Sequence, residues 1–386
     1  MSHKWILSVR KLLVLYIVFC TVLCVVPFDA YSETSTKHHM RDVLSSYIKI
    51  IPYAYNGKDL RDKKFMQYMQ EFEKSLDSSA HAAFLKNSNF GPNLKIIKDS
   101  VSQFKESTKM KNYYFAKNGL KTIAAKCVSC HSQLPKNSYG KINGKYNAVI
   151  DTEVKSLYDR AMMSYLLRDY PSAIKRFSGA IKEYQSEPQI QDRSIRKIIK
   201  IAYMNNIGTK DLVDRLSGFK SLIKKPSYLY ESLEAWIKQV KTFKAVPTKT
   251  KIDTAVKKLL IPIENEMKSG DPDQFRVQLH YMQGLLSQSM SMDPTGKNKL
   301  QSPMPLYWLG LIENAFHEDF MFSLGDMYLK NCIETFPKSK YAKKCYKAIE
   351  ESYIFGFTGS MGTHLPEDVK AELKILKEKV GITKDE

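Results

Sequence analysis

The residues of this sequence that are best suited to chemistry lie in one short stretch, KCVSCHSQLP, at residues 126–135. Two thiols three positions apart, Cys127 and Cys130, can form thioethers with the two vinyl groups of a haem, and the next imidazole, His131, can bind the haem iron. The stretch therefore predicts one covalently attached haem c, with His131 as the proximal iron ligand.

Two thiols at this spacing have three other uses: a redox dithiol, half of a zinc site, or a structural disulfide. A thioredoxin-type dithiol is expected in a βαβ context, and the surrounding sequence has no strand-like alternation. A zinc site needs two further ligands, and His280, His317 and His364 are isolated, so they are interpreted as structural or surface residues. The sequence also has no convincing nucleophile triad, phosphate loop or carboxylate pair, so we do not expect an enzyme.

The N-terminus predicts export. Basic residues precede LLVLYIVFCTVLCVV, an uncharged run of 15 residues, and Ala30 and Ser32 are the small residues that a signal peptidase requires before a cut ahead of Glu33. The alternative, an uncleaved anchor, is disfavoured because the run is shorter than the ~20 residues that span a bilayer. We therefore predict that residues 1–32 are a signal peptide and that the mature chain is periplasmic, where thiols are normally oxidised.

Four amphipathic helical patterns precede residue 135, each with apolar residues every three to four positions. They comprise Met40, Val43, Leu44, Tyr47 and Ile51; Phe65, Met69, Phe72 and Leu76; Leu94, Ile97, Val101 and Phe104; and Tyr113, Ala116, Leu120, Ile123, Cys127 and Cys130. The first is expected to stop at Pro52, and the third to begin just after Gly91 and Pro92. Four such patterns predict an antiparallel four-helix bundle over residues 33–135.

A haem-attachment motif at the C-terminal end of the last of four helices resembles the cytochrome c-prime and related class II c-type cytochromes. The resemblance covers residues 38–135 and implies that Cys127 and Cys130 carry the thioethers and that His131 is the proximal ligand. The long helical region that follows departs from the stand-alone family, which argues against a simple diffusing carrier.

The sixth iron position follows from topology, since an up-down-up-down bundle sets the start of its first helix beside the end of its fourth. Met40 opens the apolar pattern there and is the predicted distal ligand, with His38 or His39 as alternatives and His81 as a more distant one. A thioether ligand favours electron transfer, whereas a vacant position, with Met40 as core filler, favours binding of small gases.

Residues 136–150, KNSYGKINGKYNAVI, lack helical periodicity and are the predicted linker to a second region, residues 151–386. Its first unit resembles a tetratricopeptide helical hairpin, and MYLKNCIETFPKSKYAKKCYKAIEES reads as a second, partial one. The apolar and small positions of the first unit are Leu157, Ala161, Tyr170, Ala173, Ile174, Phe177, Ala180 and Ile181. The sequence therefore predicts an all-α protein in which the four-helix haem bundle is followed by an α-solenoid of degenerate TPR-like hairpins.

The second hairpin predicts a disulfide between Cys332 and Cys345. The turn centres near Lys338, so the two cysteines lie six residues before it and seven after it, at nearly the same height on antiparallel helices. Export to an oxidising compartment favours the bond if their Cα atoms approach closely enough. Two buried thiols on different faces are the alternative.

The charge of the chain indicates its partners. The formal net charge is +20, and residues 33–150 carry 20 Lys and Arg against 9 Asp and Glu. In an exported protein this excess favours an acidic protein partner or peripheral contact with a membrane surface over nucleic acid, although a solvated basic surface explains it equally well.

These observations predict an exported monohaem c-type cytochrome that transfers electrons and holds a protein redox partner through its TPR-like region. Two alternatives stay open: a haem-based sensor or scavenger of small gases such as NO or CO, and an interaction scaffold whose haem stabilises the fold. The coordination of the iron separates electron transfer from gas binding.

Overall fold

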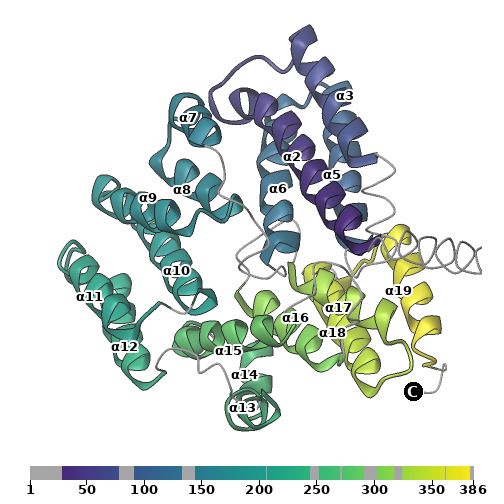
Figure 1. Ribbon diagram of the computed structural model, residues 1–386. Helices are drawn as coiled ribbons and strands as arrows, with labels where there is room; N and C mark the ends of the chain where they lie inside the picture. Colours follow the sequence, from purple (N-terminus) through teal and green to yellow (C-terminus); the bar gives the residue numbers. More distant parts are fainter. Residues whose placement is uncertain are drawn as a thin grey trace, which may run out of the picture.

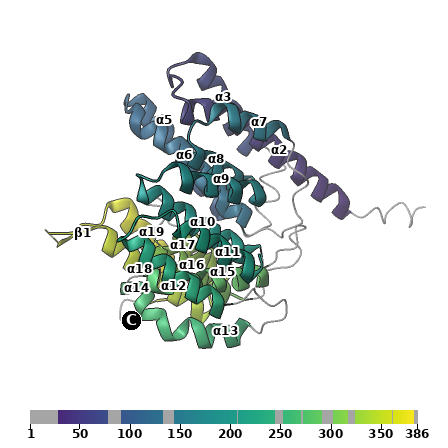
Figure 2. The same cartoon turned by 90° about the vertical axis from the view of Figure 1, so that its left-hand side faces the viewer.

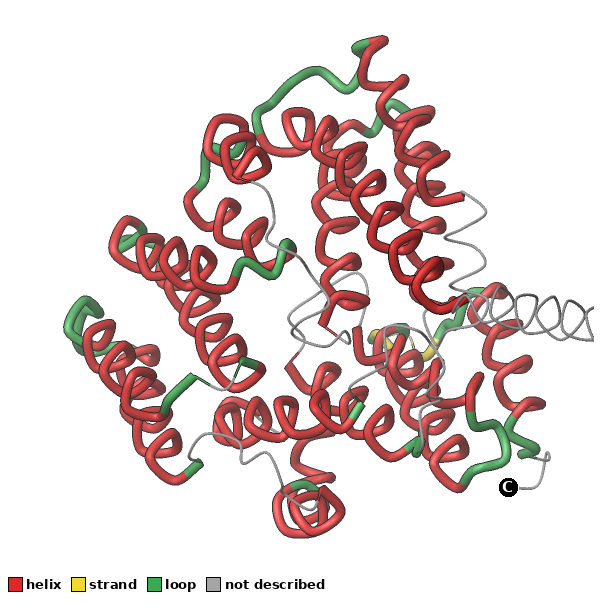
Figure 3. The backbone as a smooth tube through the Cα atoms, viewed as in Figure 1, coloured by secondary structure: helices red, strands yellow, loops and turns green. Residues whose placement is uncertain are grey.

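The structure, a computed structural model, describes residues 28–77, 91–132, 144–205, 207–243, 252–269, 272–290, 302–316, 324–360 and 362–382 (Figure 1). Apart from loops and one short β-hairpin, this part of the chain is helical, which confirms the all-α prediction (Figure 3). The α-helices are α2 (Phe28–Tyr55), α3 (Lys63–Asp77), α5 (Gly91–Lys109), α6 (Tyr113–Ser132), α7 (Gly144–Glu153), α8 (Leu157–Leu166), α9 (Tyr170–Glu183), α10 (Pro188–Met204), α11 (Thr209–Lys220), α12 (Tyr228–Thr242), α13 (Ile252–Leu259), α14 (Glu264–Ser269), α15 (Arg276–Ser289), α16 (Met304–Phe316), α17 (Leu324–Thr335), α18 (Lys340–Gly356) and α19 (Glu367–Lys379). Two 3₁₀ helices, η2 (Ile261–Ile263) and η3 (Pro272–Phe275), and the strands β1 (Thr358–Gly359) and β2 (Gly362–Thr363) complete the elements.

Helices α2, α3, α5 and α6 pack side by side, each against two of the others. Contacts between α2 and α3 run in opposite directions along the two helices, from Ser46 with Ser75 to Tyr53 with Phe65. The ion pairs between α3 and α5 also run in opposite directions along these two helices. Only three residues join α5 to α6. The four helices therefore alternate up and down, so that α2 begins at the end of the group where α6 finishes (Figure 1).

The apolar positions expected in these helices form their core. Phe65, Met69, Phe72 and Leu76 are all buried on α3. The same holds for Val43, Tyr47 and Ile51 of α2, for Ile97, Val101 and Phe104 of α5, and for Ala116, Leu120 and Ile123 of α6, while Leu44 and Tyr113 are partly buried. The spacing of three and four residues thus identified the inward face of each helix.

Pro52 does not end α2, contrary to expectation. The helix continues to Tyr55, and the amide N–H of Asn56 donates to the carbonyl of Pro52 at 3.0 Å. A proline in a helix loses one backbone hydrogen bond. Burial of the next two residues, Tyr53 and Ala54, stabilises the helical path beyond it.

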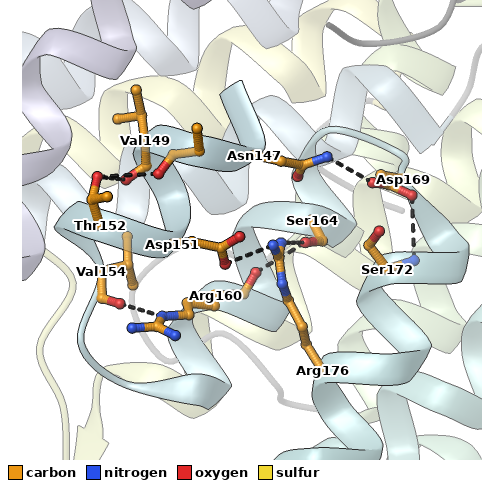
Figure 4. A network of polar contacts seen from close by, with 11 residues as sticks. Asn147, Val149, Asp151, Thr152, Val154, Arg160, Ser164, Asp169, Ser172 and Arg176 are labelled. Carbon is orange, nitrogen blue, oxygen red and sulfur yellow. Dashed lines mark hydrogen bonds and ion pairs between the residues drawn. The ribbon is translucent and has the colours of Figure 1, made fainter. Parts of the chain in front are cut away.

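The expected linker ends in a helix, because residues 144–150 form the first part of α7; residues 136–143 lie outside the described chain. Tyr146 shares a 3.3 Å hydrogen bond with Ser45 of α2, and Asn147 donates to Asp169, which caps α9. Figure 4 shows Arg176 of α9 reaching Asp151 of α7 at 2.8 Å. Helix α7 therefore joins the first four helices to the hairpin that follows.

That hairpin consists of α8 and α9, which pack closely together. Its predicted small positions, Ala161, Ala173 and Ala180, are fully buried, and Tyr158 of α8 packs edge-on against Phe177 of α9. Ile174, Phe177 and Ile181 are also buried, whereas Leu157 and Tyr170 are partly exposed.

The later helices do not stack in simple chain order. Helix α10 packs against α9 and then against α15, while α11 and α12 pair with each other beside it (Figure 1). From α15 onward the neighbours follow the sequence through α16, α17, α18 and α19. One continuous apolar core runs from Val43 to Ile382 through both parts of the chain.

Helices α16 and α17 cross at two glycines. A Cβ atom on Gly325 would lie 2.5 Å from the backbone oxygen of Gly310 and would collide with the side chain of Asn314. No real Cβ contact is that short, so glycine is required for this approach of the two backbones. The α17–α18 hairpin follows directly, with its turn at Phe336–Ser339 as expected.

Candidate haem-attachment site

The CVSCH motif lies in the last two turns of α6, where the backbone of Cys127, Cys130 and His131 is helical. The side chains of residues 124–132 lie outside the described part of the structure. In both views this end of the helix is directed toward α16 and α17 (Figures 1 and 2).

The helical backbone places the three motif residues on one side of α6. Positions i, i+3 and i+4 of a helix share a face, which is the relationship of Cys127 to Cys130 and His131. The buried residues of α6, Ala116, Leu120 and Ile123, precede Cys127 at spacings of four, three and four. The motif therefore continues the helix face that packs into the core.

The start of α2 runs alongside this end of α6. The phenol of Tyr47 donates a 3.1 Å hydrogen bond to the backbone oxygen of Leu120, which fixes the relative height of the two helices. Cys127 is seven residues beyond Leu120, and Met40 is seven residues before Tyr47. Both displacements are about 10 Å in the same direction, since each helical residue rises ~1.5 Å.

Met40 and Cys127 are thus at about the same height on neighbouring helices. The backbone of His38 and His39 also lies within α2. The side chains of residues 28–40 are outside the described part, as are all of residues 1–27 and the segment 78–90 that contains His81. The described geometry therefore leaves the choice among these ligands a prediction.

Contacts higher on α6 hold the helix between α2 and α8. The ammonium of Lys121 lies 3.6 Å from the carboxylate of Asp159 on α8 and 4.9 Å from the ring centre of Tyr55 on α2. Burial raises the pKa of Tyr55, and the nearby Asp159 charge adds to that shift. The tyrosine stays protonated at neutral pH and packs as an aromatic side chain under the lysine.

The cysteines of the α17–α18 hairpin come together, as the height argument expects. Cys332 and Cys345 are free thiols in this structure, both fully buried. Burial raises the pKa of the Cys345 thiol, and the neighbouring Cys332 adds to that shift. The two side chains lie on facing surfaces of the hairpin, and the disulfide itself stays a prediction.

The remaining histidines have separate surroundings. His280 is buried on α15, where its Nδ1 lies 2.6 Å from Oε1 of Gln283 and its ring packs 4.6 Å from the ring of Phe316. His364 is exposed in the loop after β2, and His317 lies outside the described residues. His280 is thus a structural residue, as the sequence indicated.

The polar network around His280 was not predicted from the sequence. Gln283 donates to the carboxylate of Glu313 at 2.8 Å, and the ammonium of Lys200 reaches the same oxygen at 2.7 Å. Lys200 and Glu313 are 7% and 10% exposed, so this is a buried ion pair between α10 and α16. Because its members are 113 residues apart, no local spacing could have predicted it.

The side chains that the structure describes contain no group of three or more His, Cys, Asp or Glu that could hold a metal ion. The side chains of the CVSCH motif lie outside this part of the structure. No helix within the described ranges is both long enough and apolar enough to cross a membrane.

Comparisons with known proteins provide no family for the chain. No protein-family model matches the sequence, and no curated protein or solved structure is significantly similar to it.

Proposed function

We propose that this chain is an exported monohaem c-type cytochrome that transfers electrons. The observation that carries the proposal is the position of CVSCH at the end of α6, on the face that continues the buried stripe and beside the start of α2. Two thiols and an imidazole at i, i+3 and i+4 on one helix face suit covalent attachment to one ring together with one axial ligand.

In this proposal α2, α3, α5 and α6 form a haem bundle like that of class II c-type cytochromes. Cys127 and Cys130 would hold the haem through thioethers, and His131 would provide the proximal nitrogen. When bound, the haem supplies a one-electron iron couple. The start of α2 supplies the opposite side, where Met40 is the proposed distal ligand and His38 and His39 are the alternatives.

The chain's own residues would tune and shield this couple. The apolar face of α6 above the motif, at Leu120 and Ile123, is fully buried and excludes water from that side. Low solvent exposure and the identity of the axial ligand are the main means by which a protein sets a haem potential.

The helical hairpins would form an interaction region for a redox partner. The pairs α8–α9 and α17–α18 are hairpins of the kind found in α-solenoids, and Lys-rich surface would orient an acidic partner and increase its association rate. Residues 1–32 would direct export and then be removed. N-terminal sequencing of the periplasmic protein is the direct test, with Glu33 expected first.

Haem attachment is tested by the mass of the denatured protein. The purified chain, made in cells that mature c-type cytochromes, should keep a covalent adduct of one haem and a haem-dependent peroxidase stain on a denaturing gel. Cys127→Ala with Cys130→Ala should lose both, while Cys332→Ala with Cys345→Ala removes the same number of thiols and should keep both. A wild-type chain that releases all of its haem on denaturation would end the proposal.

Gas binding is the competing function, and the ferrous spectrum separates it from electron transfer. A six-coordinate low-spin iron that is unchanged by carbon monoxide supports the electron-transfer proposal. A five-coordinate iron whose spectrum shifts at once on exposure to carbon monoxide would favour the gas-binding alternative.

A further inference from the structure

The end of the four-helix group opposite the haem motif carries an exposed apolar tip. Met110, in the connection between α5 and α6, is 77% exposed, and Tyr114, in the first turn of α6, is 81% exposed. Phe115, also in the first turn of α6, and Met66, in the first turn of α3, are 39% and 40% exposed. These four residues, which we call the apolar tip, are large hydrophobic side chains that the described core does not cover.

The two connections that bear the tip belong to one end of the molecule. The guanidinium of Arg61, before α3, lies 6.0 Å from the ring centre of Tyr113, at the start of α6. Phe65 of α3 packs edge-on against Phe104 near the end of α5. Figure 2 shows the α2–α3 and α5–α6 connections at the upper, outer end of the structure.

Exposed lysines surround the apolar tip. Lys58, Lys63, Lys64 and Lys111 are exposed, and none of them forms an ion pair with another described residue. We call these four the lysine rim. Lys58 also lies 5.9 Å from the ring centre of Tyr53, but the residue is exposed.

The acidic side chains at this end are already engaged within the chain. Asp59 pairs with Arg61 at 2.6 Å, and Glu106 pairs with Lys109 at 2.6 Å. Asp62 accepts the hydroxyl of Tyr53 at 3.1 Å and the backbone N–H of Lys64 at 2.9 Å. The bonds of Asp62 come from neutral donors and do not cancel a carboxylate charge, but the four lysines of the rim outnumber it, so the charge that remains for an outside partner is positive.

We propose that this end of the chain docks on an anionic lipid surface. Aromatic and methionine side chains of a projecting end can enter the headgroup region, and the surrounding lysines can pair with anionic headgroups. The end is formed by two short connections, so it can press into a deformable bilayer without a complementary pocket. The choice of a lipid over a redox protein rests on the proposed haem function, whereas vesicle binding can be measured without it.

The position of the tip favours a lipid over a redox partner. Tyr114 precedes Cys127 by 13 residues on the same helix, a separation of about 20 Å along its axis at ~1.5 Å per residue. A partner that exchanges electrons must approach the motif. Docking through the tip leaves the motif end of α6 facing away from the lipid surface.

Vesicle flotation with the purified full chain tests the proposal. The protein should float with vesicles that contain phosphatidylglycerol and should stay behind with vesicles of phosphatidylcholine alone. Lys63→Gln with Lys64→Gln should lower the partition coefficient about tenfold or more, since each surface lysine near an anionic bilayer is worth roughly a factor of five. Tyr114→Ser should lower it severalfold by removing an inserted ring.

Matched control variants lie on other parts of the chain. Lys257→Gln with Lys258→Gln removes two adjacent exposed lysines of α13, and Phe355→Ser removes a side chain of α18 that is 78% exposed. Both controls should bind nearly as the wild type does. Equal losses from the two lysine pairs would show that net charge alone drives binding and would overturn the proposal.

Two further results would also overturn it. One is the absence of flotation with phosphatidylglycerol vesicles at low salt. The other is retention on immobilised polyglutamate, sensitive to Lys63→Gln with Lys64→Gln, without any vesicle binding, which would assign this end to an acidic protein.

Discussion

Tyr47 of α2 donates its phenolic hydrogen to the backbone oxygen of Leu120 on α6, in the interior of the four-helix group. This one bond sets the register of the two helices whose ends carry Met40 and the CVSCH motif. Leu120 is fully buried and Tyr47 is 3% exposed, so no water competes for the bond.

Removal of this hydroxyl should weaken the protein measurably. Tyr47→Phe keeps the ring and loses the hydrogen bond, and we expect the free energy of unfolding to fall by about 1 kcal/mol. Urea denaturation followed by circular dichroism measures the change. Tyr146→Phe, which removes a hydrogen bond to Ser45 at an exposed position, serves as the control and should change stability by less than about 0.5 kcal/mol.

The iron spectrum should depend on Met40. If its thioether is the distal ligand, Met40→Ala converts a six-coordinate low-spin iron to high spin, because the sixth position loses its ligand. His38→Ala and His39→Ala should leave the spectrum as it is. A spectrum that Met40→Ala does not alter would transfer the assignment to one of these histidines or to a vacant position.

Cys332 and Cys345 should be joined in the exported protein. Both thiols are buried on the paired helices α17 and α18, and Cys332 is close enough to Cys345 to affect its pKa, so an oxidising compartment should join them. Closing a loop of 12 intervening residues should add roughly 3 kcal/mol on the chain-entropy estimate. Peptide mapping without reductant decides the matter: if both thiols alkylate freely in denaturant, the bond does not form.

The buried ion pair should tolerate removal of both charges better than removal of one. Glu313→Gln leaves the ammonium of Lys200 buried without its counter-charge, which typically costs about 3–5 kcal/mol. Lys200→Met combined with Glu313→Leu should cost much less, because apolar groups then fill the space. Thermal unfolding of the two variants gives the comparison, and equal losses would refute the role of the charge.

An exposed ion pair on α19 serves as the control for this experiment. Lys370 and Glu367 are 54% and 89% exposed on α19. Glu367→Gln should change stability by less than about 1 kcal/mol, as exposed ion pairs contribute little.

The crossing of α16 and α17 should not accept a methyl group. Gly325→Ala brings a Cβ against Asn314 and the backbone of Gly310, so the two helices must separate, and we expect a loss of more than about 2 kcal/mol. Gly218→Ala on α11 meets nothing within 4 Å and should stabilise its helix by roughly 0.5–1 kcal/mol. Chemical denaturation distinguishes the two; a neutral Gly325→Ala would mean that the crossing is looser than described.

The local sequence pattern predicted the buried residues correctly wherever burial depends on one face of a single helix. The spacing of Phe65, Met69, Phe72 and Leu76 predicted the buried side of α3, and the small residues Ala161, Ala173 and Ala180 predicted the α8–α9 contact. The heights of Cys332 and Cys345 followed from counting residues to the turn. In each case the contacting residues are close in sequence or repeat with the period of the helix.

Contacts between segments that are distant in sequence could not be predicted by counting residues in this way. The α10–α15 packing and the pair Lys200–Glu313 depend on how helices far apart in sequence come together, which periodicity does not encode. Helix α7 was missed because Gly144 and Asn147 are poor helix formers, and burial of Ile150 together with the contacts to α2 and α9 outweighs that preference.

Helix α7 also limits how the chain can be cut into fragments for expression. A boundary at residue 150 would separate Asp151 from its helix, and with it the ion pair to Arg176. Ile150 and Val154, both essentially unexposed, would be left at a new surface on either side of the cut. Truncation products ending there should therefore be prone to aggregation, and the intact polypeptide should melt in a single calorimetric transition.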